Sequence, residues 1–227
     1  MKVEIWSDVV CPWCYIGKRR FESALEKFDE DIDVIYRSFE LSPDAPRRVP
    51  GSMEDMLAAK YGMSAERAKQ MLAQVTQAAA AEGLDFDFSS AKTGNTFDAH
   101  RVLHFALAEG VQNDVKERLM RAYFVEGRAV AERDELLKIA GEAGLDTAKL
   151  AEVLDSDTYA EDVRADIERA RRIGVKGVPF ILIDGEVGIS GAQPPETFLE
   201  ALKGVQLRRE QMRADACNEG MCVSPDE

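Results

Sequence analysis

The chain has 227 residues, of which 45% are hydrophobic and 31% are charged, so it can bury a sizeable core in one large domain or two small ones. The formal net charge of -13 argues against binding to nucleic acid or to an anionic membrane, because both need a basic face. No apolar run approaches the roughly 20 residues that span a bilayer, and the N-terminus lacks the apolar stretch of a signal peptide. We therefore expect a cytoplasmic protein without nucleic-acid or membrane partners.

The first forty residues have the pattern of a strand, a helix and a second strand. Residues 3–10 are rich in valine and isoleucine and predict a strand. Apolar residues then recur at helical spacing over 12–28, with Pro12 just inside the start, where its missing N–H has no partner to lose. A second strand is expected at 32–41, before a proline-rich stretch.

A long helical section follows, after which the chain returns to strands. Helices are expected at 52–61, 64–82, 96–109, 112–126, 132–143, 146–154 and 157–173. Strands at 179–183 and 187–190 are joined by the turn residues Asp184-Gly185, and a helix begins at Pro195. This order predicts an α/β fold whose single core is split by an inserted helical subdomain.

All four cysteines lie in two pairs, one near each end of the chain. The first pair is Cys11 and Cys14, separated by Pro-Trp, and the second is Cys217 and Cys222. Structural disulfides are rare in the cytosol, where paired cysteines are more often redox-active or metal-binding. The spacing therefore argues against isolated buried thiols.

The first pair has the placement of a redox-active dithiol. Cys11 falls where the strand ends and the helix begins, so unpaired backbone N–H groups and the helix dipole should favour its thiolate. Cys14 follows nearly one turn later, which puts the two Cα atoms roughly 5 Å apart, within reach of a disulfide. We expect Cys11 to be the nucleophile and Cys14 the resolving cysteine.

Three segments, DVVCPWCYIGKRRFE, NTFDAHRVLHFA and VKGVPFILIDGEVGISGAQPPETF, resemble the DsbA-like thiol oxidoreductases of the thioredoxin superfamily, in particular the FrnE subfamily. The resemblance covers essentially the whole chain. It implies a thioredoxin fold with a large inserted all-helical subdomain and a C-terminal tail extension. It also implies a cis Val178-Pro179 bond beside the redox pair, with the backbone of Val178 holding an extended substrate against Cys11.

The same resemblance suggests a division of the chain. The thioredoxin-like core would comprise 1–45 and 174–204, with helix 157–173 packed on it. Residues 46–156 would form the inserted subdomain, and 205–227 the extension with the second cysteine pair. The implied activity is thiol–disulfide exchange with protein or small-molecule thiols and disulfides and an unidentified electron donor, without a bound cofactor.

Glutathione-dependent isomerases and kappa-class glutathione transferases of the same superfamily are the enzymatic alternative. They usually carry serine at the position of Cys11 and lack the second cysteine, so the retention of Cys14 favours dithiol–disulfide chemistry. A role for glutathione stays open. The direction of electron flow depends on the reduction potential of the pair relative to its compartment.

The second pair, Cys217 and Cys222, has the spacing CxxxxC. In a continuous helix these residues would be roughly 8–9 Å apart, too far for a disulfide, but Asn218 and Gly220 favour a turn. Three interpretations stay open: an auxiliary redox pair that exchanges electrons with Cys11 and Cys14, a structural or incidental pair, and half of a Cys₄ zinc site in a binding module.

Other candidate residues surround the first pair. Pro12, Trp13 and Phe39 are expected to add apolar surface near the thiols for substrate binding, with a place in the core as the alternative for Phe39. Asp8 could transfer protons to the pair, although capping of the helix as a solvated carboxylate is favoured. The basic run that begins at Lys18 is expected to be a solvated helix face.

The two histidines, His100 and His104, lie four residues apart and share one helix face. A metal role is disfavoured because no HExxH-type glutamate accompanies them. His100 belongs to the family-like segment together with Asn95. Two alternatives stay open for it: partial burial beside Leu103 and Leu107, or a substrate-binding place in the lining of the cleft.

Overall fold

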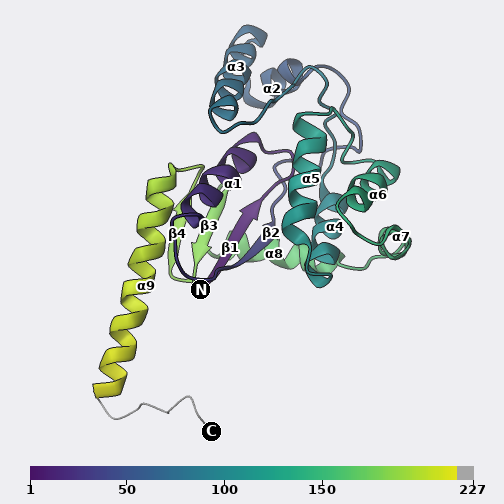
Figure 1. Ribbon diagram of the computed structural model, residues 1–227. Coiled ribbons are helices and arrows are strands. Elements are labelled where there is room, and N and C mark those ends of the chain that lie inside the picture. Colours follow the sequence, from purple (N-terminus) through teal and green to yellow (C-terminus); the bar gives the residue numbers. More distant parts are fainter. Residues whose placement is uncertain (219–227) are drawn as a thin grey trace.

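The structure, a computed structural model, describes residues 1–218 and the side chains of residues 1–215. Its four-stranded sheet has the order β2-β1-β3-β4 (Figure 1). β1 (Lys2–Ser7) pairs in parallel with β2 (Asp33–Ser38) and antiparallel with β3 (Phe180–Ile183), which pairs antiparallel with β4 (Val187–Ser190). A parallel pair needs a crossover, which the first helix supplies.

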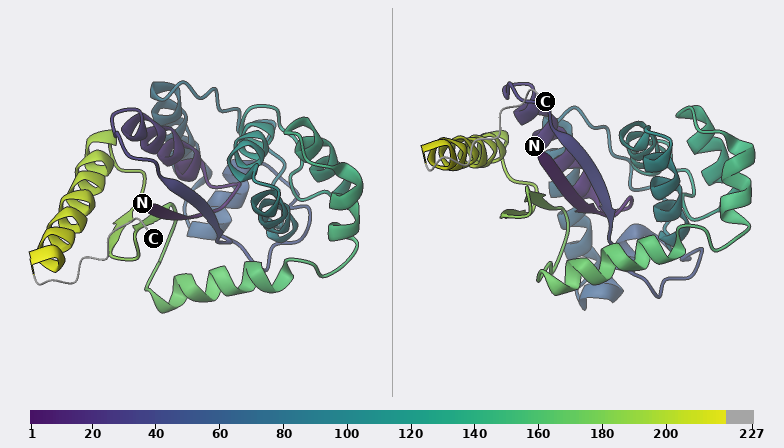
Figure 2. Two further views of the ribbon diagram at one scale, coloured as in Figure 1. Left: turned by 60° about the horizontal axis from the view of Figure 1, so that its bottom comes forward. Right: turned by 90° about the horizontal axis from the view of Figure 1, so that it is seen from below.

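Three helices cover the sheet: α1 (Pro12–Leu25), α8 (Ala160–Arg172) and α9 (Pro195–Asn218). Strand side chains alternate between the two faces, so Ile5 packs with α1 and α9 whereas Trp6 packs with α8. Nε1 of Trp6 donates a hydrogen bond to the carbonyl oxygen of Asp166 at 3.0 Å, which fixes α8 against β1. Figure 2 shows α8 running along the sheet, away from α9.

Between β2 and α8 the described chain forms α2 (Met53–Tyr61), α3 (Ala65–Ala81), α4 (Phe97–Ala108), α5 (Gln112–Phe124), α6 (Arg133–Glu142) and α7 (Thr147–Leu154). The start of α2 is fixed by Ser52, whose hydroxyl accepts the backbone N–H of Asp55. Ser64 caps α3 in the same way, accepting the N–H of Arg67. The thioredoxin-like α/β fold with a helical insertion is therefore confirmed.

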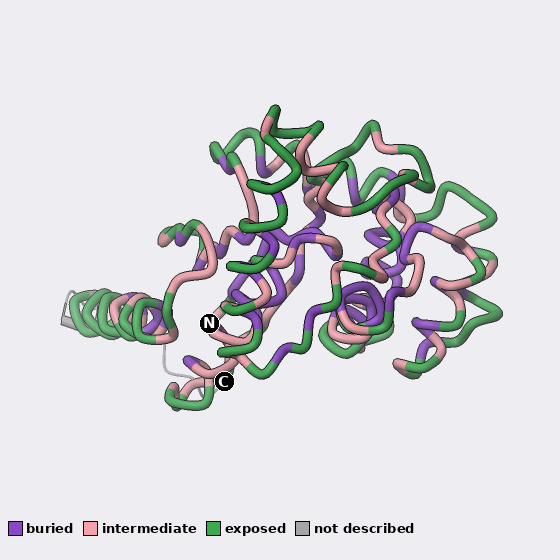
Figure 3. Tube along the Cα trace, turned by 90° about the horizontal axis from the view of Figure 1, so that it is seen from above, coloured by how far each residue is buried: buried purple, intermediate pink, exposed green. Residues whose placement is uncertain are grey.

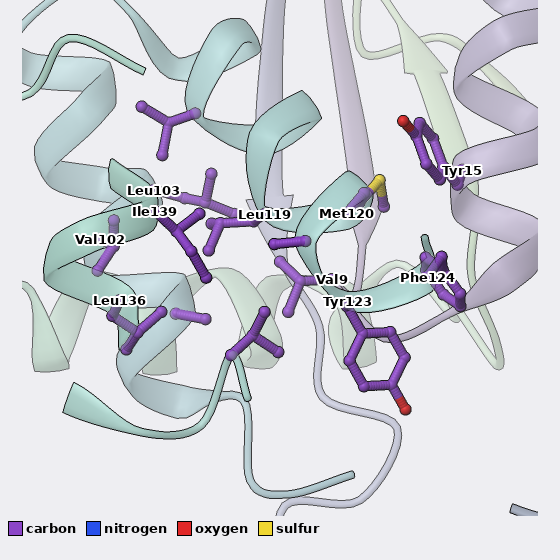
Figure 4. Close-up of a cluster of buried hydrophobic side chains, with 14 of the residues drawn as sticks. Val9, Tyr15, Val102, Leu103, Leu119, Met120, Tyr123, Phe124, Leu136 and Ile139 are labelled. Atoms are coloured by element: carbon purple, nitrogen blue, oxygen red, sulfur yellow. The ribbon is translucent and has the colours of Figure 1, made fainter. Parts of the chain in front are cut away.

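The inserted helices share a hydrophobic core with the CPWC turn. Val9, Cys14 and Tyr15 belong to the same buried cluster as residues of α3, α4, α5, α6 and α7. Figure 4 shows part of this cluster, where the rings of Tyr15 and Phe124 lie 6.1 Å apart. Residues from the insertion are thus in place to shape the environment of the redox pair.

Element ends differ from the predicted ones by a few residues. The first strand ends at Ser7 because the chain turns, with the N–H of Cys11 donating to the carbonyl oxygen of Asp8 at 3.3 Å. The first helix ends at Leu25, not at residue 28, and the second strand covers Asp33–Ser38, not 32–41. The proposed limits of the inserted subdomain, 46–156, stay a prediction.

The last helix extends beyond the sheet. α9 continues past the predicted core limit at residue 204, and Val205 is still buried against the sheet side. Residues 210–215 are all exposed, as Figure 3 shows. Within the described residues, no helix combines the length and apolar character that a bilayer crossing requires.

Candidate active site

The CPWC turn places the two thiols at the start of α1. Cys11 is the N-cap residue in extended conformation (φ -90°, ψ 113°), and Pro12 occupies the first turn. The N–H of Cys14 donates to the carbonyl oxygen of Cys11 at 3.0 Å. Both residues are nearly buried, with 4% and 3% exposure, but Cys11 alone of the two lines a cleft. A substrate sulfur can therefore meet Cys11 and not Cys14.

The loop before β3 contacts the thiol of Cys11. Val178-Pro179 is a cis peptide, as expected. The thiol of Cys11 donates to the carbonyl oxygen of Val178 at 3.6 Å. The carbonyl of Pro179 in turn accepts the N–H of Gly191 at 2.8 Å, which ties this loop to the end of β4. The backbone of Val178 thus lies where a substrate segment would meet Cys11.

In the reduced pair, the pKa values of the two thiols are shifted in opposite directions. Hydrogen bonding with Cys14 and burial raise the pKa of the Cys11 thiol well above its ordinary value. Burial also opposes ionisation of Cys14, but hydrogen bonding from Cys11, the positive charge of Lys116 and the hydroxyl of Ser7 outweigh it and lower the pKa of Cys14. In the reduced pair, hydrogen bonding with Cys14 and burial therefore oppose the effect of the helix start on the Cys11 thiolate.

Asp8 is fully buried, so its interpretation as a solvated helix cap is wrong. Its Oδ2 accepts the backbone N–H of Leu41 at 2.8 Å, and its Oδ1 lies 3.5 Å from Nε2 of His100. Burial alone would raise the pKa of Asp8, but His100 and the N–H of Leu41 stabilise the carboxylate, and the net shift is downward. Asp8 therefore places a buried negative charge beside the thiol pair.

The cleft beside Cys11 has a volume of about 560 Å³ and is mainly apolar. Its apolar lining comes from the CPWC turn, the loop after β2, α2, α3, the segment that follows α3, α5 and the cis-proline loop. The residues that line it include Trp13, Leu41, Val49, Met53, Met56, Leu57, Tyr61, Met71, Leu72, Phe88 and Tyr123. Lys60 and Lys176 are the lysines in this lining. An apolar peptide segment or small molecule would fit its chemistry.

The predicted substrate-binding residues divide into two groups. Pro12, Trp13 and Val178 line the cleft, and Trp13 is 42% exposed. Phe39 does not line the cleft and packs against the buried cluster around Trp6. His100 is fully buried behind Asp8 and does not line the cleft either. Its contribution to the site is therefore to hold Asp8, not to form the cleft surface.

The basic run in α1 is not a solvated face. Lys18 is 4% exposed, and its Nζ lies 3.0 Å from a carboxylate oxygen of Glu117 in α5. Arg19 also pairs with Glu117, and Nε of Arg20 donates to Glu82 at 2.6 Å. These ion pairs join the redox helix to the insertion. The partners are distant in sequence, so the spacing of the basic residues alone gave no sign of them.

The metal interpretations gain no support from the described residues. His104 lies within 3.1 Å of Ser38 Oγ and of Asp166 Oδ2, which gives it two protein partners. The described part of the chain contains no group of three or more His, Cys, Asp or Glu side chains that could hold an ion. The second cysteine pair lies outside this test, because Cys222 and the side chain of Cys217 are outside the described residues.

Two ionisable residues near the thiols were missed by the sequence analysis. Lys116 of α5 is fully buried, and burial lowers its pKa to about 8. Glu40 lies in the loop after β2, where burial and the charge of Asp8 raise its pKa to about 7. A sequence signal existed for Lys116, which shares its helix face with Leu119 and Tyr123 at spacings of three and seven.

Comparison with known proteins agrees with this geometry. The DSBA-like thioredoxin domain profile matches residues 2–203. The chain is similar to a crystal structure of a probable DsbA oxidoreductase from Streptomyces coelicolor, with 42% identity, a TM-score of 0.85 and coverage of 90% of this chain and 89% of that one. The uncharacterised protein YwbO of Bacillus subtilis (strain 168) is 28% identical over 212 residues, which are 91% of this chain and 98% of that protein.

A second solved structure is similar in fold. The cytosolic disulfide reductase DsbM from Pseudomonas aeruginosa superposes with a TM-score of 0.63 at 22% identity, covering 92% of this chain and 99% of that one. The profile match over nearly the whole chain, with the thiol pair at the helix start, carries the assignment. The chain belongs to the DsbA-like thioredoxin-domain family.

Proposed function

We propose that the protein is a thiol–disulfide oxidoreductase of the FrnE type in which Cys11 attacks the substrate and Cys14 resolves the mixed disulfide. The observation that carries this proposal is the unequal access of the two thiols. Cys11 lines the cleft beside Val178, whereas Cys14 is buried one helical turn behind it. Such an arrangement exposes the first sulfur to substrate and keeps the second for an intramolecular reaction.

In the reductive direction, Cys11 passes its proton to the Cys14 thiolate and its sulfur attacks a substrate disulfide. The Cys11–substrate S–S bond forms, the substrate S–S bond breaks, and the electron pair leaves on a thiolate that takes a proton from water. Cys14 then loses its proton to water and attacks the sulfur of Cys11, and the second substrate sulfur leaves as a thiolate that takes a proton from water. The protein ends as a disulfide, and a dithiol donor reduces it again.

The same residues oxidise a dithiol substrate when these steps run in reverse. Because the two cysteines carry the electrons, the reaction needs no bound cofactor, and glutathione or a protein dithiol would serve as the donor. The apolar cleft supports thiols and disulfides of proteins or of apolar small molecules as substrates. A cytoplasmic location is part of the proposal. The electron donor would then have to match the reducing poise of that compartment.

The test is reduction of insulin disulfides by the parent protein and two variants in the presence of a dithiol donor. We expect Cys11→Ser to abolish turnover, and Cys14→Ser to accumulate a mixed disulfide that non-reducing mass spectrometry detects. Full turnover by Cys11→Ser would refute the proposal. Activity that survives Cys14→Ser, together with saturable glutathione binding, would support the glutathione-dependent alternative. Equimolar zinc that persists through dialysis would support the zinc-binding module.

A further inference from the structure

Ser7, His100 and Lys116 are buried polar residues close to the thiol pair, and the reaction steps described above assign them no role. Among them, Nζ of Lys116 has no hydrogen-bond partner within the described residues, whereas Nε2 of His100 lies 3.5 Å from Oδ1 of Asp8. The Lys116 ammonium lies 5.6 Å above the centre of the Tyr36 ring. A buried cation without a hydrogen-bond partner is costly unless a nearby negative charge compensates it.

Several elements present ionisable groups to Lys116. These groups are Cys11, Cys14 and Lys18 from the redox helix, Asp8 from the loop before it, His100 from α4 and Tyr36 from β2. Among the acidic groups, Cys14 contributes most to keeping Lys116 charged, and Asp8 contributes next. Lys116 is likewise the charged side chain that most favours the ionised form of Cys14. Cys14 and Asp8 are therefore the two acidic groups whose negative charge favours the buried ammonium most, and Cys14 is the one of the two that reacts.

We propose that Lys116 is the counter-cation of the Cys14 thiolate and sets the pH dependence of the step in which Cys14 resolves the mixed disulfide. This inference rests on the proposed function. Lys116 is a positioning residue, because it touches neither the substrate nor the sulfur under attack and acts through the charge of Cys14. It comes from α5, so the insertion supplies the electrostatic environment of the second thiol.

The surrounding charges explain why a cation is needed. The N–H of Leu41 and the nearby His100 stabilise the ionised form of Asp8, and the negative charge of Asp8 opposes ionisation of Cys11. Without Lys116, Cys14 would have to ionise in a buried site beside a carboxylate. In the resolving step the Cys14 proton goes to water, the Cys14–Cys11 bond forms, and the electron pair leaves on the substrate sulfur. Lys116 neither gains nor loses a proton in this sequence.

The experiment uses the reaction of the reduced enzyme with 5,5′-dithiobis(2-nitrobenzoate), followed by stopped flow in a Cys217→Ser, Cys222→Ser background. Attack by Cys11 releases the first thionitrobenzoate, and resolution by Cys14 releases the second. We expect Lys116→Met and Lys116→Gln to raise the pH midpoint of the second release by about one unit and to slow it about tenfold at pH 7. In a Cys14→Ser background, the same Lys116 substitutions should change the rate of the first release far less than they change the rate of the second release when Cys14 is present.

Lys18→Met is the matched control, because Lys18 is also a buried lysine in this region but has carboxylate partners in Glu22 and Glu117. It should lower stability and leave the pH midpoint of the second release close to that of the parent. An unchanged midpoint in both Lys116 variants would overturn the inference. Absence of the second release from the parent enzyme itself would instead refute the proposed function, so the two failures are distinguishable.

Discussion

Gly17 of the redox helix lies directly against Pro179 of the cis-proline loop. A Cβ atom at Gly17 would stand 3.0 Å from Cγ of Pro179 and 3.4 Å from Cβ of Ala192. Glycine inside a helix costs about 0.5–1 kcal/mol relative to alanine, so this position is explained by the close approach of the loop. We expect Gly17→Val to lower the free energy of unfolding by roughly 2 kcal/mol and to slow insulin reduction, because the loop must move away from Cys11.

The matched control is Gly204→Ala in α9, where a Cβ would meet nothing closer than Nη1 of Arg208 at 3.9 Å. That substitution should raise helix stability by about 0.5–1 kcal/mol and leave the reaction rate unchanged. Chemical denaturation and the insulin assay measure both effects. Wild-type turnover by Gly17→Val would show that the packing of Pro179 on the helix does not matter for the reaction.

A second prediction concerns Glu4, a buried carboxylate in the central strand. Its Oε1 lies 2.6 Å from guanidinium nitrogens of Arg37 and Arg169. Burial raises the pKa of Glu4, but the hydrogen bonds from Arg169 and Arg37 outweigh it and lower the pKa to about 2. Because the folded pKa lies below the unfolded one, the stabilisation is present above about pH 4.5 and is lost as the pH falls toward 2.

We therefore expect Glu4→Gln to lower the free energy of unfolding by about 3 kcal/mol at pH 7, since it removes the carboxylate that Arg169 and Arg37 share and leaves Arg37 with Asp166 alone. The difference from the parent should shrink on acidification toward pH 3, in urea denaturation at both pH values. Glu66→Gln, at an exposed position of α3, is the control and should have little effect. A pH-independent difference for Glu4→Gln would mean that lost packing, not lost charge, is responsible.

Glu40 should show the opposite pH dependence. Burial and the charge of Asp8 raise its pKa to about 7, although Nδ2 of Asn95 donates to it at 3.4 Å. A raised folded pKa means that stability is complete below about pH 4.5 and is lost as the pH rises through 7. We expect Glu40→Gln to be more stable than the parent by about 1 kcal/mol at pH 8, allowing for partial exposure, and not at pH 5. Thermal unfolding at the two pH values tests this, and an equal effect at both would contradict it.

The parts of the site that were predictable are those that the sequence encodes locally. Cys11, Pro12 and Cys14 are neighbours in the chain, so their place at a helix start followed from the hydrophobic pattern before them. The cis geometry of Val178-Pro179 followed from the resemblance to a family, not from the residue pattern. Both were found in the structure.

The parts that were missed depend on contacts between distant segments. Lys18 looked like a surface residue because its carboxylate partner Glu117 lies in the insertion, about a hundred residues further along. Lys116 was overlooked for the same reason, since its relation to Cys14 arises only when α5 packs on the redox helix. Asp8 was misjudged as solvated because the loop that buries it, with Leu41, comes after the second strand. Tertiary packing, which a single sequence does not display, decided all three.

The last prediction concerns Cys217 and Cys222. The proposed role is to carry electrons between a donor and Cys11–Cys14. A continuous helix would keep thiols five residues apart too far from each other for a disulfide. Asn218 is the last residue of α9, so the turn that would bring the thiols together rests on Gly220. We expect the double variant Cys217→Ser, Cys222→Ser to slow steady-state insulin reduction a few-fold without abolishing it, because the CPWC pair can still react directly with a small dithiol. Single-turnover reaction of the pre-reduced enzyme should stay unchanged, which separates donor transfer from substrate chemistry. An unchanged steady-state rate would remove the relay.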